Sequence, residues 1–298
     1  MRHQAFNGST RHIMTIPKGC RNFGLTVLFA GLSVWTLAAA RQTPDPSGLR
    51  LVDEYQSPGL ECEIAGIYPH PTDDALYFAA ANAKPNYQEG QHQLLPIAFR
   101  GKLLVVNRHS GKIVKAFPLT GGQYGGLAYG DGRLFVSHLD PPEILKVNID
   151  DGTILDRIPI SGPAGGLKYD TQRSLLVAQL FVSHPHLAVI DPRTKATREM
   201  LWSDETAMDL ANVRGDWLCT WVSGFDAAAV SELRLLDRGT GKVKGRVVLD
   251  GVYTSMAPLD KNVAGIDGFI ALVKVDARSG RVVVRKHEYD GKAIKWVM

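Results

Sequence analysis

The chain has 298 residues, of which 34 are basic and 30 acidic. The first 40 residues contain four of the bases and no acid, so residues 41–298 carry equal numbers of positive and negative side chains. This balance, together with the lack of a basic patch with interleaved aromatic residues, excludes a nucleic-acid binder.

Residues 1–40 predict a signal peptide. An uncharged, apolar stretch at 25–40 ends in three alanines, as at a cleavage site, and the bases that precede it are Arg2, Arg11, Lys18 and Arg21. The stretch is shorter than the roughly 20 residues that a helix needs to span a bilayer. We expect cleavage, a periplasmic or secreted protein, and no membrane span in the mature chain. An uncleaved membrane anchor is the alternative.

Residues 41–298 are expected to form one domain, which begins with a strand at 49–55 (LRLVDEY) and continues as a repeat. The segment YGGLAYGDGRLFVSH at 124–138 aligns with AGGLKYDTQRSLLVAQ at 164–179. An Asn or Asp opens a short turn downstream of each repeated segment, at 107–111, 148–152, 191–195, 237–241 and 276–280. The Asx side chain caps such a turn and a closing Gly accepts positive φ, which is typical of hairpins.

Four short strands in each repeat of about 40 residues predict an all-β fold, the β-propeller. The blades are expected at 64–119, 120–160, 161–201, 202–250 and 251–298. The strand at 49–55 should complete the last blade and close the ring, which removes exposed strand edges. Two alternatives are a sixth blade, built on a hairpin around Asp290, and a β-sandwich with coincidental spacing.

The pattern of GGLxY, a strand and then an Asx turn resembles two groups of proteins. One is the exported propellers of the YVTN and quinoprotein amine dehydrogenase-like group, and the other is the gluconolactonase (senescence marker protein 30)-like propellers. The WD dipeptide of the WD40 class and the FTQGL-type motif of propeller glutamine cyclotransferases are both missing. The resemblance covers the mature chain and implies the fold, which many unrelated functions share.

In each blade the chain is expected to run from the innermost strand outward. The loops that enter the first strand and those that join the second to the third then lie on one face, which we call the loop-rich face. A small ligand or a protein partner is expected to bind there, at the mouth of the central channel. The candidate residues are Glu63, Gln123, His138, Asp140, His184, His186, Glu205 and Asp226.

The stretch FVSHPHLAVID at 181–191 places two histidines around Pro185. Residues two apart on an extended chain point to the same side, so His184 and His186 could converge, with His138 one blade earlier. Imidazole and carboxylate groups could bind a divalent metal, calcium or zinc, or an imidazole beside a carboxylate could act as a general base. A solvated turn directed by Pro185 is the alternative.

The gluconolactonase-like resemblance implies a second function, a metal-dependent lactonase. Those enzymes place a metal-binding Glu just before the first inner strand, and Glu63 holds the matching position. Asp209 and Asn212 are possible matches for their Asn and Asp ligands, although the surrounding AMDLANV departs from the family pattern. Whether the protein is an enzyme stays open.

A polar insertion at 82–100 lengthens the first blade and predicts a lid over the channel mouth or an arm for a partner, with a neutral loop as the alternative. Cys62 and Cys219 fall in blades one and four, which are not neighbours in a ring of five, so two free thiols are expected. Trp217 and Trp221 share one side of a strand with Cys219, which indicates packing between blades.

Overall fold

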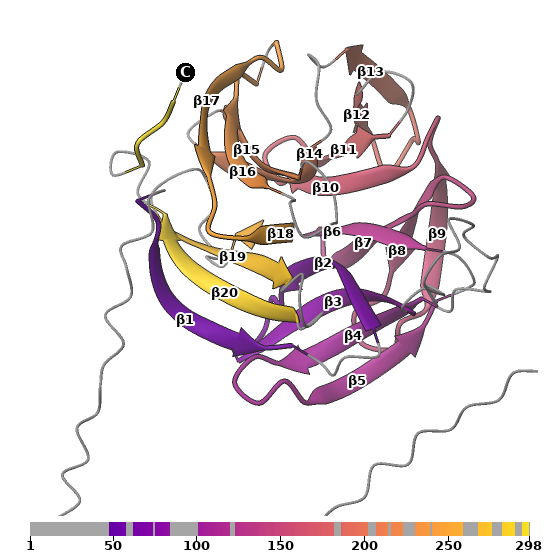
Figure 1. Ribbon diagram of the computed structural model, residues 1–298. Helices are drawn as coiled ribbons and strands as arrows, with labels where there is room; N and C mark the ends of the chain where they lie inside the picture. Colours follow the sequence, from indigo (N-terminus) through magenta and orange to yellow (C-terminus); the bar gives the residue numbers. More distant parts are fainter. Residues whose placement is uncertain are drawn as a thin grey trace, which may run out of the picture. The chain divides into compact units, whose positions relative to one another are not determined.

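A computed structural model describes residues 48–57, 62–73, 75–83, 101–119, 123–181, 186–201, 207–213, 216–222, 230–238, 240–258, 268–275, 282–289 and 294–297. These residues form twenty strands in five four-stranded antiparallel sheets. The sheets are the blades of a propeller (Figure 1), so the predicted five-bladed fold is confirmed.

The predicted blade boundaries agree with the strands to within a few residues, except at the C-terminus, where blade five ends at Tyr289 and not at 298. Blade one consists of β2 (Cys62–Pro69), β3 (Leu76–Ala83), β4 (Lys102–Asn107) and β5 (Ile113–Pro118). Blade two consists of β6 (Tyr124–Gly130), β7 (Arg133–His138), β8 (Glu143–Val147) and β9 (Ile154–Pro159). Blade three consists of β10 (Ala164–Asp170), β11 (Leu175–Leu180), β12 (His186–Ile190) and β13 (Thr197–Leu201). Blade four consists of β14 (Ala207–Val213), β15 (Asp216–Val222), β16 (Ser231–Leu236) and β17 (Val243–Val248). Blade five consists of β18 (Val252–Pro258), β19 (Gly268–Val275), β20 (Val282–Tyr289) and, from the start of the domain, β1 (Arg50–Gln56).

The N-terminal strand closes the ring, as predicted. Strand β1 pairs antiparallel with β20, from Arg50 opposite Glu288 to Gln56 opposite Val283. The C-terminal residues pack elsewhere, because Val297 pairs with Arg246 on β17 of blade four. No sixth blade is therefore formed by the part of the chain that the structure describes.

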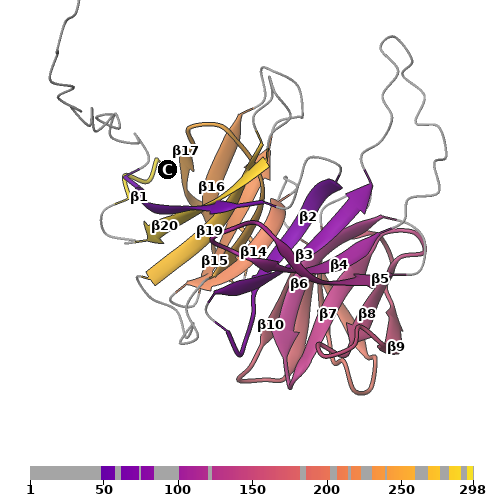
Figure 2. The same cartoon turned by 90° about the horizontal axis from the view of Figure 1, so that it is seen from below.

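The repeated Gly-Gly pair is explained by the packing of the inner strands. Strands β2, β6, β10, β14 and β18 contact one another in turn, and β18 contacts β2. The first four of these strands are labelled in Figure 2. A Cβ atom on Gly125 would lie 2.5 Å from the Ala164 carbonyl oxygen, and one on Gly126 would lie 2.7 Å from that of Gly165. Since both neighbours are backbone atoms, only Gly allows adjacent blades to approach this closely.

The Asx turns join the third and fourth strands, as the sequence predicts. The Asn107 side chain accepts hydrogen bonds from the backbone amides of His109 and Ser110, and Gly111 adopts a φ of 66°. In blade three the closing position is Lys195, which adopts the same left-handed conformation with a φ of 64°. The fifth predicted turn, 276–280, lies outside the described residues.

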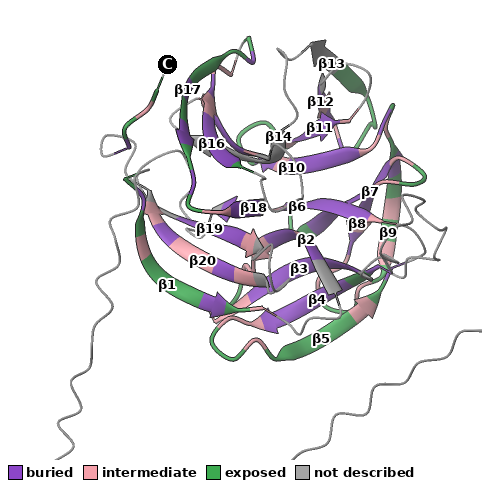
Figure 3. Cartoon of the chain, in the orientation of Figure 1, coloured by how far each residue is buried: buried purple, intermediate pink, exposed green. Residues whose placement is uncertain are grey.

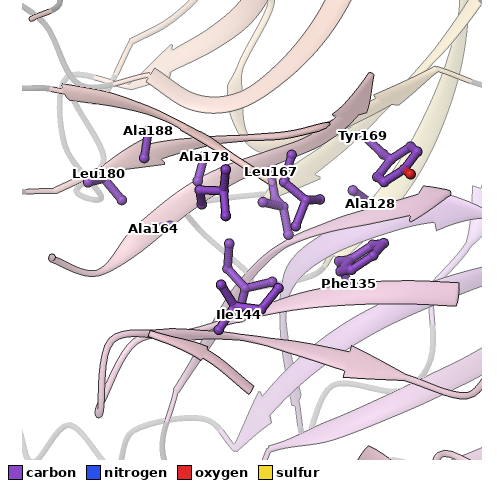
Figure 4. Close-up of a cluster of buried hydrophobic side chains, with 12 residues drawn as sticks. Ala128, Phe135, Ile144, Ala164, Leu167, Tyr169, Ala178, Leu180 and Ala188 are labelled. Carbon is purple, nitrogen blue, oxygen red and sulfur yellow. The ribbon is translucent and has the colours of Figure 1, made fainter. Parts of the chain in front are cut away.

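The interfaces between blades are filled by apolar side chains. Between blades two and three, Phe135 and Tyr169 stack with ring centroids 5.5 Å apart, beside Leu167 (Figure 4). The described side chains of the inner and middle strands are mostly buried, whereas the outer strands β1 and β5 expose most of their side chains (Figure 3). No helix in the described part of the chain has the length and hydropathy needed to cross a membrane.

Trp217 of β15 packs between blades, as predicted, whereas Trp221 is partly buried with the Arg234 guanidinium of the same blade 4.1 Å from its ring centre. Trp217 and Cys219 are both buried and share one apolar cluster with Val177 and Leu187 of blade three. Cys219 is a free thiol, and burial raises its pKa well above the usual value. The side chain of Cys62 lies outside the described part of the chain, so its predicted state stays a prediction.

Candidate functional site

Strand pairing defines which residues lie at the loop-rich face. The inner strands begin where the second strands end, because Tyr124 pairs with His138 and Ala164 pairs with Leu180. In the same way the first residue of β2, Cys62, pairs with the last residue of β3, Ala83. The strand ends therefore meet on one face in each blade, as the order of strands predicts.

Buried polar side chains gather near this face. Each of the following lies at or within two residues of a strand end on the loop-rich face: Asn82, Ser137, His138, Glu143, Gln179, Thr220, Ser231 and Glu232. Only Asp170, Arg234 and His287 are buried polar residues elsewhere among the described positions. Buried polar groups cost desolvation energy unless they are paired, and most of these side chains have hydrogen-bond partners.

A histidine–carboxylate pair joins the second and third strands of blade two. The His138 Nδ1 atom lies 3.0 Å from Glu143 Oε1, and only 2% of His138 is exposed. The Arg157 guanidinium also donates to Glu143 Oε1. The three residues come from β7, β8 and β9, so the cluster follows from the pairing of successive strands.

The imidazole of His138 is held by an aromatic ring as well as by the carboxylate. The rings of His138 and Tyr124 stack with centroids 4.9 Å apart and planes tilted by 21°. Tyr124 occupies space that only Gly101 leaves open, since a Cβ atom there would lie 1.9 Å from its ring. A carboxylate on Nδ1 fixes the orientation of an imidazole, which prepares the ring for binding or proton transfer.

Asn82 ties this cluster to blade one. Its side-chain nitrogen donates to the Tyr124 carbonyl oxygen at 2.9 Å, and its side-chain oxygen accepts from the Tyr124 amide at 2.9 Å. Asn82 and Ala83 belong to β3, so the predicted insertion begins later than position 82. Residues 84–100, the remainder of that insertion, lie outside the described part of the chain.

The structure brings together three of the predicted site residues. The Gln123 carbonyl oxygen accepts a hydrogen bond from the Leu139 amide at 2.8 Å, which places Gln123 beside His138 and the turn that contains Asp140. Asp140 is exposed in this turn and precedes a cis peptide bond to Pro141.

The backbone positions of three further predicted residues are described, although their side chains are not. Glu63 pairs with Asn82 at the loop-rich end of β2, and His186 pairs with Leu180 at the loop-rich end of β12. Asp209 pairs with Thr220. The positions of His184, Glu205 and Asp226 lie outside the described residues, so the convergence of His184 with His186 stays a prediction.

The predicted metal site also stays a prediction. The described side chains contain no group of three or more His, Cys, Asp or Glu residues that could hold a metal ion. The side chains of Glu63 and Asp209, on which the lactonase comparison depends, are outside that set. Glu143 and Arg157, which contact each other beside His138, are site residues that the sequence did not predict.

No protein-family model matches the chain, and no curated protein matches its sequence. Among solved structures, a glutaminyl cyclase from Myxococcus xanthus is similar, with 16% identity, 81% of this chain and 97% of that chain covered, and a TM-score of 0.58. The hydrazine synthase of Kuenenia stuttgartiensis matches with 14% identity, 74% and 64% coverage, and a TM-score of 0.44. A nidogen–laminin complex matches with 13% identity, 79% and 83% coverage, and a TM-score of 0.47. At these identities the first similarity supports the propeller fold alone, and the other two carry no argument.

Proposed function

We propose that the protein is an exported binding module that holds a small ligand or a protein partner on the loop-rich face of blades one and two. The buried pair of His138 and Glu143, whose carboxylate also accepts from the exposed Arg157 guanidinium, is the observation that carries this proposal. An apolar set of the same volume would stabilise a blade as well or better. Charged residues at this end of the blade therefore favour a role in ligand recognition over a role in stabilising the fold.

The chemistry of the cluster suits a polar ligand. The carboxylate of Glu143 holds the His138 ring on one side, while Tyr124 packs flat against it. A ligand that reaches this point would meet an imidazole, a carboxylate and a guanidinium, which together offer both donors and acceptors. The 84–100 segment follows Asn82 almost directly in the chain, which supports its proposed role as a cover for the site.

Export is the second element of the proposal, and it rests on residues 1–40. Basic residues, an apolar stretch and three alanines before Arg41 are the pattern that a signal peptidase requires. Expression of the full chain in a bacterial host, followed by N-terminal sequencing of the periplasmic product, tests it. A mature terminus near Arg41 is expected, and a protein that keeps its first 40 residues in the membrane fraction contradicts it.

Ligand binding can be tested by thermal unfolding of the purified protein in the presence of a library of polar metabolites. A compound that binds the folded state raises the midpoint, and the stabilisation grows with the logarithm of one plus the ratio of its concentration to the dissociation constant. His138→Gln should abolish the shift, because it removes the imidazole that Glu143 orients. His109→Gln is the matched control, since His109 lies in an exposed turn of blade one. Equal shifts in both variants would place the binding site elsewhere.

A further inference from the structure

Around Trp217, at the interface between blades three and four, two of the described charged side chains are basic and one is acidic. Lys168 on β10 places its Nζ atom 5.4 Å from the centre of the Trp217 ring, and the Arg238 guanidinium lies 5.1 Å from the same ring. One carboxylate, Asp170, faces them and forms an ion pair with Arg238 at 2.8 Å. Of the charged groups described at this interface, Lys168 is thus left without a counter-ion.

The amine of Lys168 is buried and makes no hydrogen bond. Its position in the repeat is unusual, because the aligned segment of blade two has Ala128 there. Burial lowers the pKa of Lys168 from 10.5 to about 7, with Arg238 adding to the effect and Asp170 opposing it. An ammonium group in such a place is costly unless an anion compensates it.

A second unsatisfied group, the amide of Gln179, faces the same interface. Gln179 is fully buried, and neither its oxygen nor its nitrogen has a hydrogen-bond partner among the residues that the structure describes. Val177, two residues earlier on β11, packs with Trp217 of blade four, so Gln179 points to the same side. Lys168 pairs directly with Val177, which makes Lys168 and Gln179 diagonal neighbours about 7–8 Å apart at their Cβ atoms.

In blade two the residue that corresponds to Gln179 is Ser137, and its side chain has a hydrogen-bond partner. Ser137 stands one residue before the last residue of β7, as Gln179 does in β11. Its hydroxyl donates to the Ala164 carbonyl oxygen of the next blade. Gln179 has no such partner in blade four, although an unsatisfied buried amide costs about 1–3 kcal/mol.

We propose that the interface of blades three and four binds a small monocarboxylate, whose oxygens accept hydrogen bonds from the Lys168 ammonium and the Gln179 amide nitrogen. The single uncompensated charge matches one carboxylate and is exceeded by a phosphate dianion. This site is distinct from the His138 cluster, so it goes beyond the proposed function.

Propionate is the probe, titrated into the purified protein at constant ionic strength while Trp fluorescence and heat are recorded. Binding should be strongest at pH 6–7 and should weaken about tenfold per pH unit above 7, because free Lys168 must take up a proton. Heats measured in two buffers of different ionisation enthalpy should report that proton uptake. Sodium chloride and inorganic phosphate serve as competing anions and should give weaker responses.

Lys168→Met and Gln179→Leu should each weaken propionate binding about tenfold or more, as expected for loss of a charge-assisted hydrogen bond. Both variants remove unsatisfied polar atoms, so they should fold, and circular dichroism checks this. Thr220→Val is the matched control, because Thr220 is also buried without a partner but lies on the same side of β15 as Leu218, which packs against blade five. Unchanged binding in Lys168→Met, no propionate signal at pH 6, or an equal response to chloride would overturn the proposal. His138→Gln should leave propionate binding unchanged, which separates this site from the first.

Discussion

Replacement of Asn82 by Ala should destabilise the propeller at the seam between blades one and two. The substitution removes two hydrogen bonds of 2.9 Å each and leaves both the amide and the carbonyl of Tyr124 without those partners. Tyr124 is 1% exposed, so water cannot replace them without opening the seam. The two hydrogen bonds contribute about 1 kcal/mol each, and the two buried backbone groups that lose these partners add a desolvation cost. The free energy of unfolding should therefore fall by about 2–4 kcal/mol.

Urea unfolding followed by far-ultraviolet circular dichroism measures this loss. Asn107→Ala is the matched control, because the Asn107 side chain also accepts several hydrogen bonds, but in an exposed turn that water can solvate. That variant should lose about 1 kcal/mol or less. If the two variants lost the same free energy, the idea that Asn82 joins the blades through buried bonds would be wrong.

Three further predictions concern the ring, its inner strands and the buried lysine. Deletion of residues 41–57 removes β1 and exposes the edge of β20, so it should cause aggregation or a large fall in the thermal midpoint; an unchanged midpoint in calorimetry would rule out ring closure. Gly126→Ala should lower the free energy of unfolding in urea by about 2–3 kcal/mol, since the new Cβ atom would lie 2.7 Å from backbone atoms. Gly132→Ala, where no atom lies within 4 Å and φ is 70°, should lower it by about 1 kcal/mol, and equal losses would contradict the close approach of the inner strands. Lys168→Met should be more stable than the parent protein at pH 7, and the difference should shrink toward pH 10. The reason is that between the lowered pKa of about 7 and the ordinary 10.5 the unfolded parent chain binds more protons than the folded one, so the parent gains stability as the pH rises. A stability difference that does not change with pH would argue against a desolvated amine.

The fold could be predicted because its signals are local and periodic. An Asx residue that opens a turn and a Gly-Gly pair that opens an inner strand recur in the sequence at about the spacing of one blade. The strand at 49–55 precedes the first repeat, and closure of a ring gives such a strand a partner. Each of these inferences depends only on residues that are close in the sequence and on the number of residues between repeats.

The position of His138 in the fold could be predicted from the sequence, but the side chains that surround it could not. His138 was identified by its position at the end of a second strand, whereas Glu143 and Arg157 were missed, because their contacts depend on the register of three strands. One signal was available, since Glu143 follows the turn after His138 and antiparallel pairing sets the two opposite each other. Lys168 offered another, as a charged residue at a position where the aligned repeat has Ala128.

The measurement that tests the binding function most directly is the metal content of the purified protein, determined by mass spectrometry without added metal. The proposed binding module should contain neither calcium nor zinc in stoichiometric amount, and it should not hydrolyse lactones. One tightly bound calcium or zinc ion per chain, lost on substitution of Glu63 or Asp209 and accompanied by lactone hydrolysis, would contradict the binding module and establish the hydrolase.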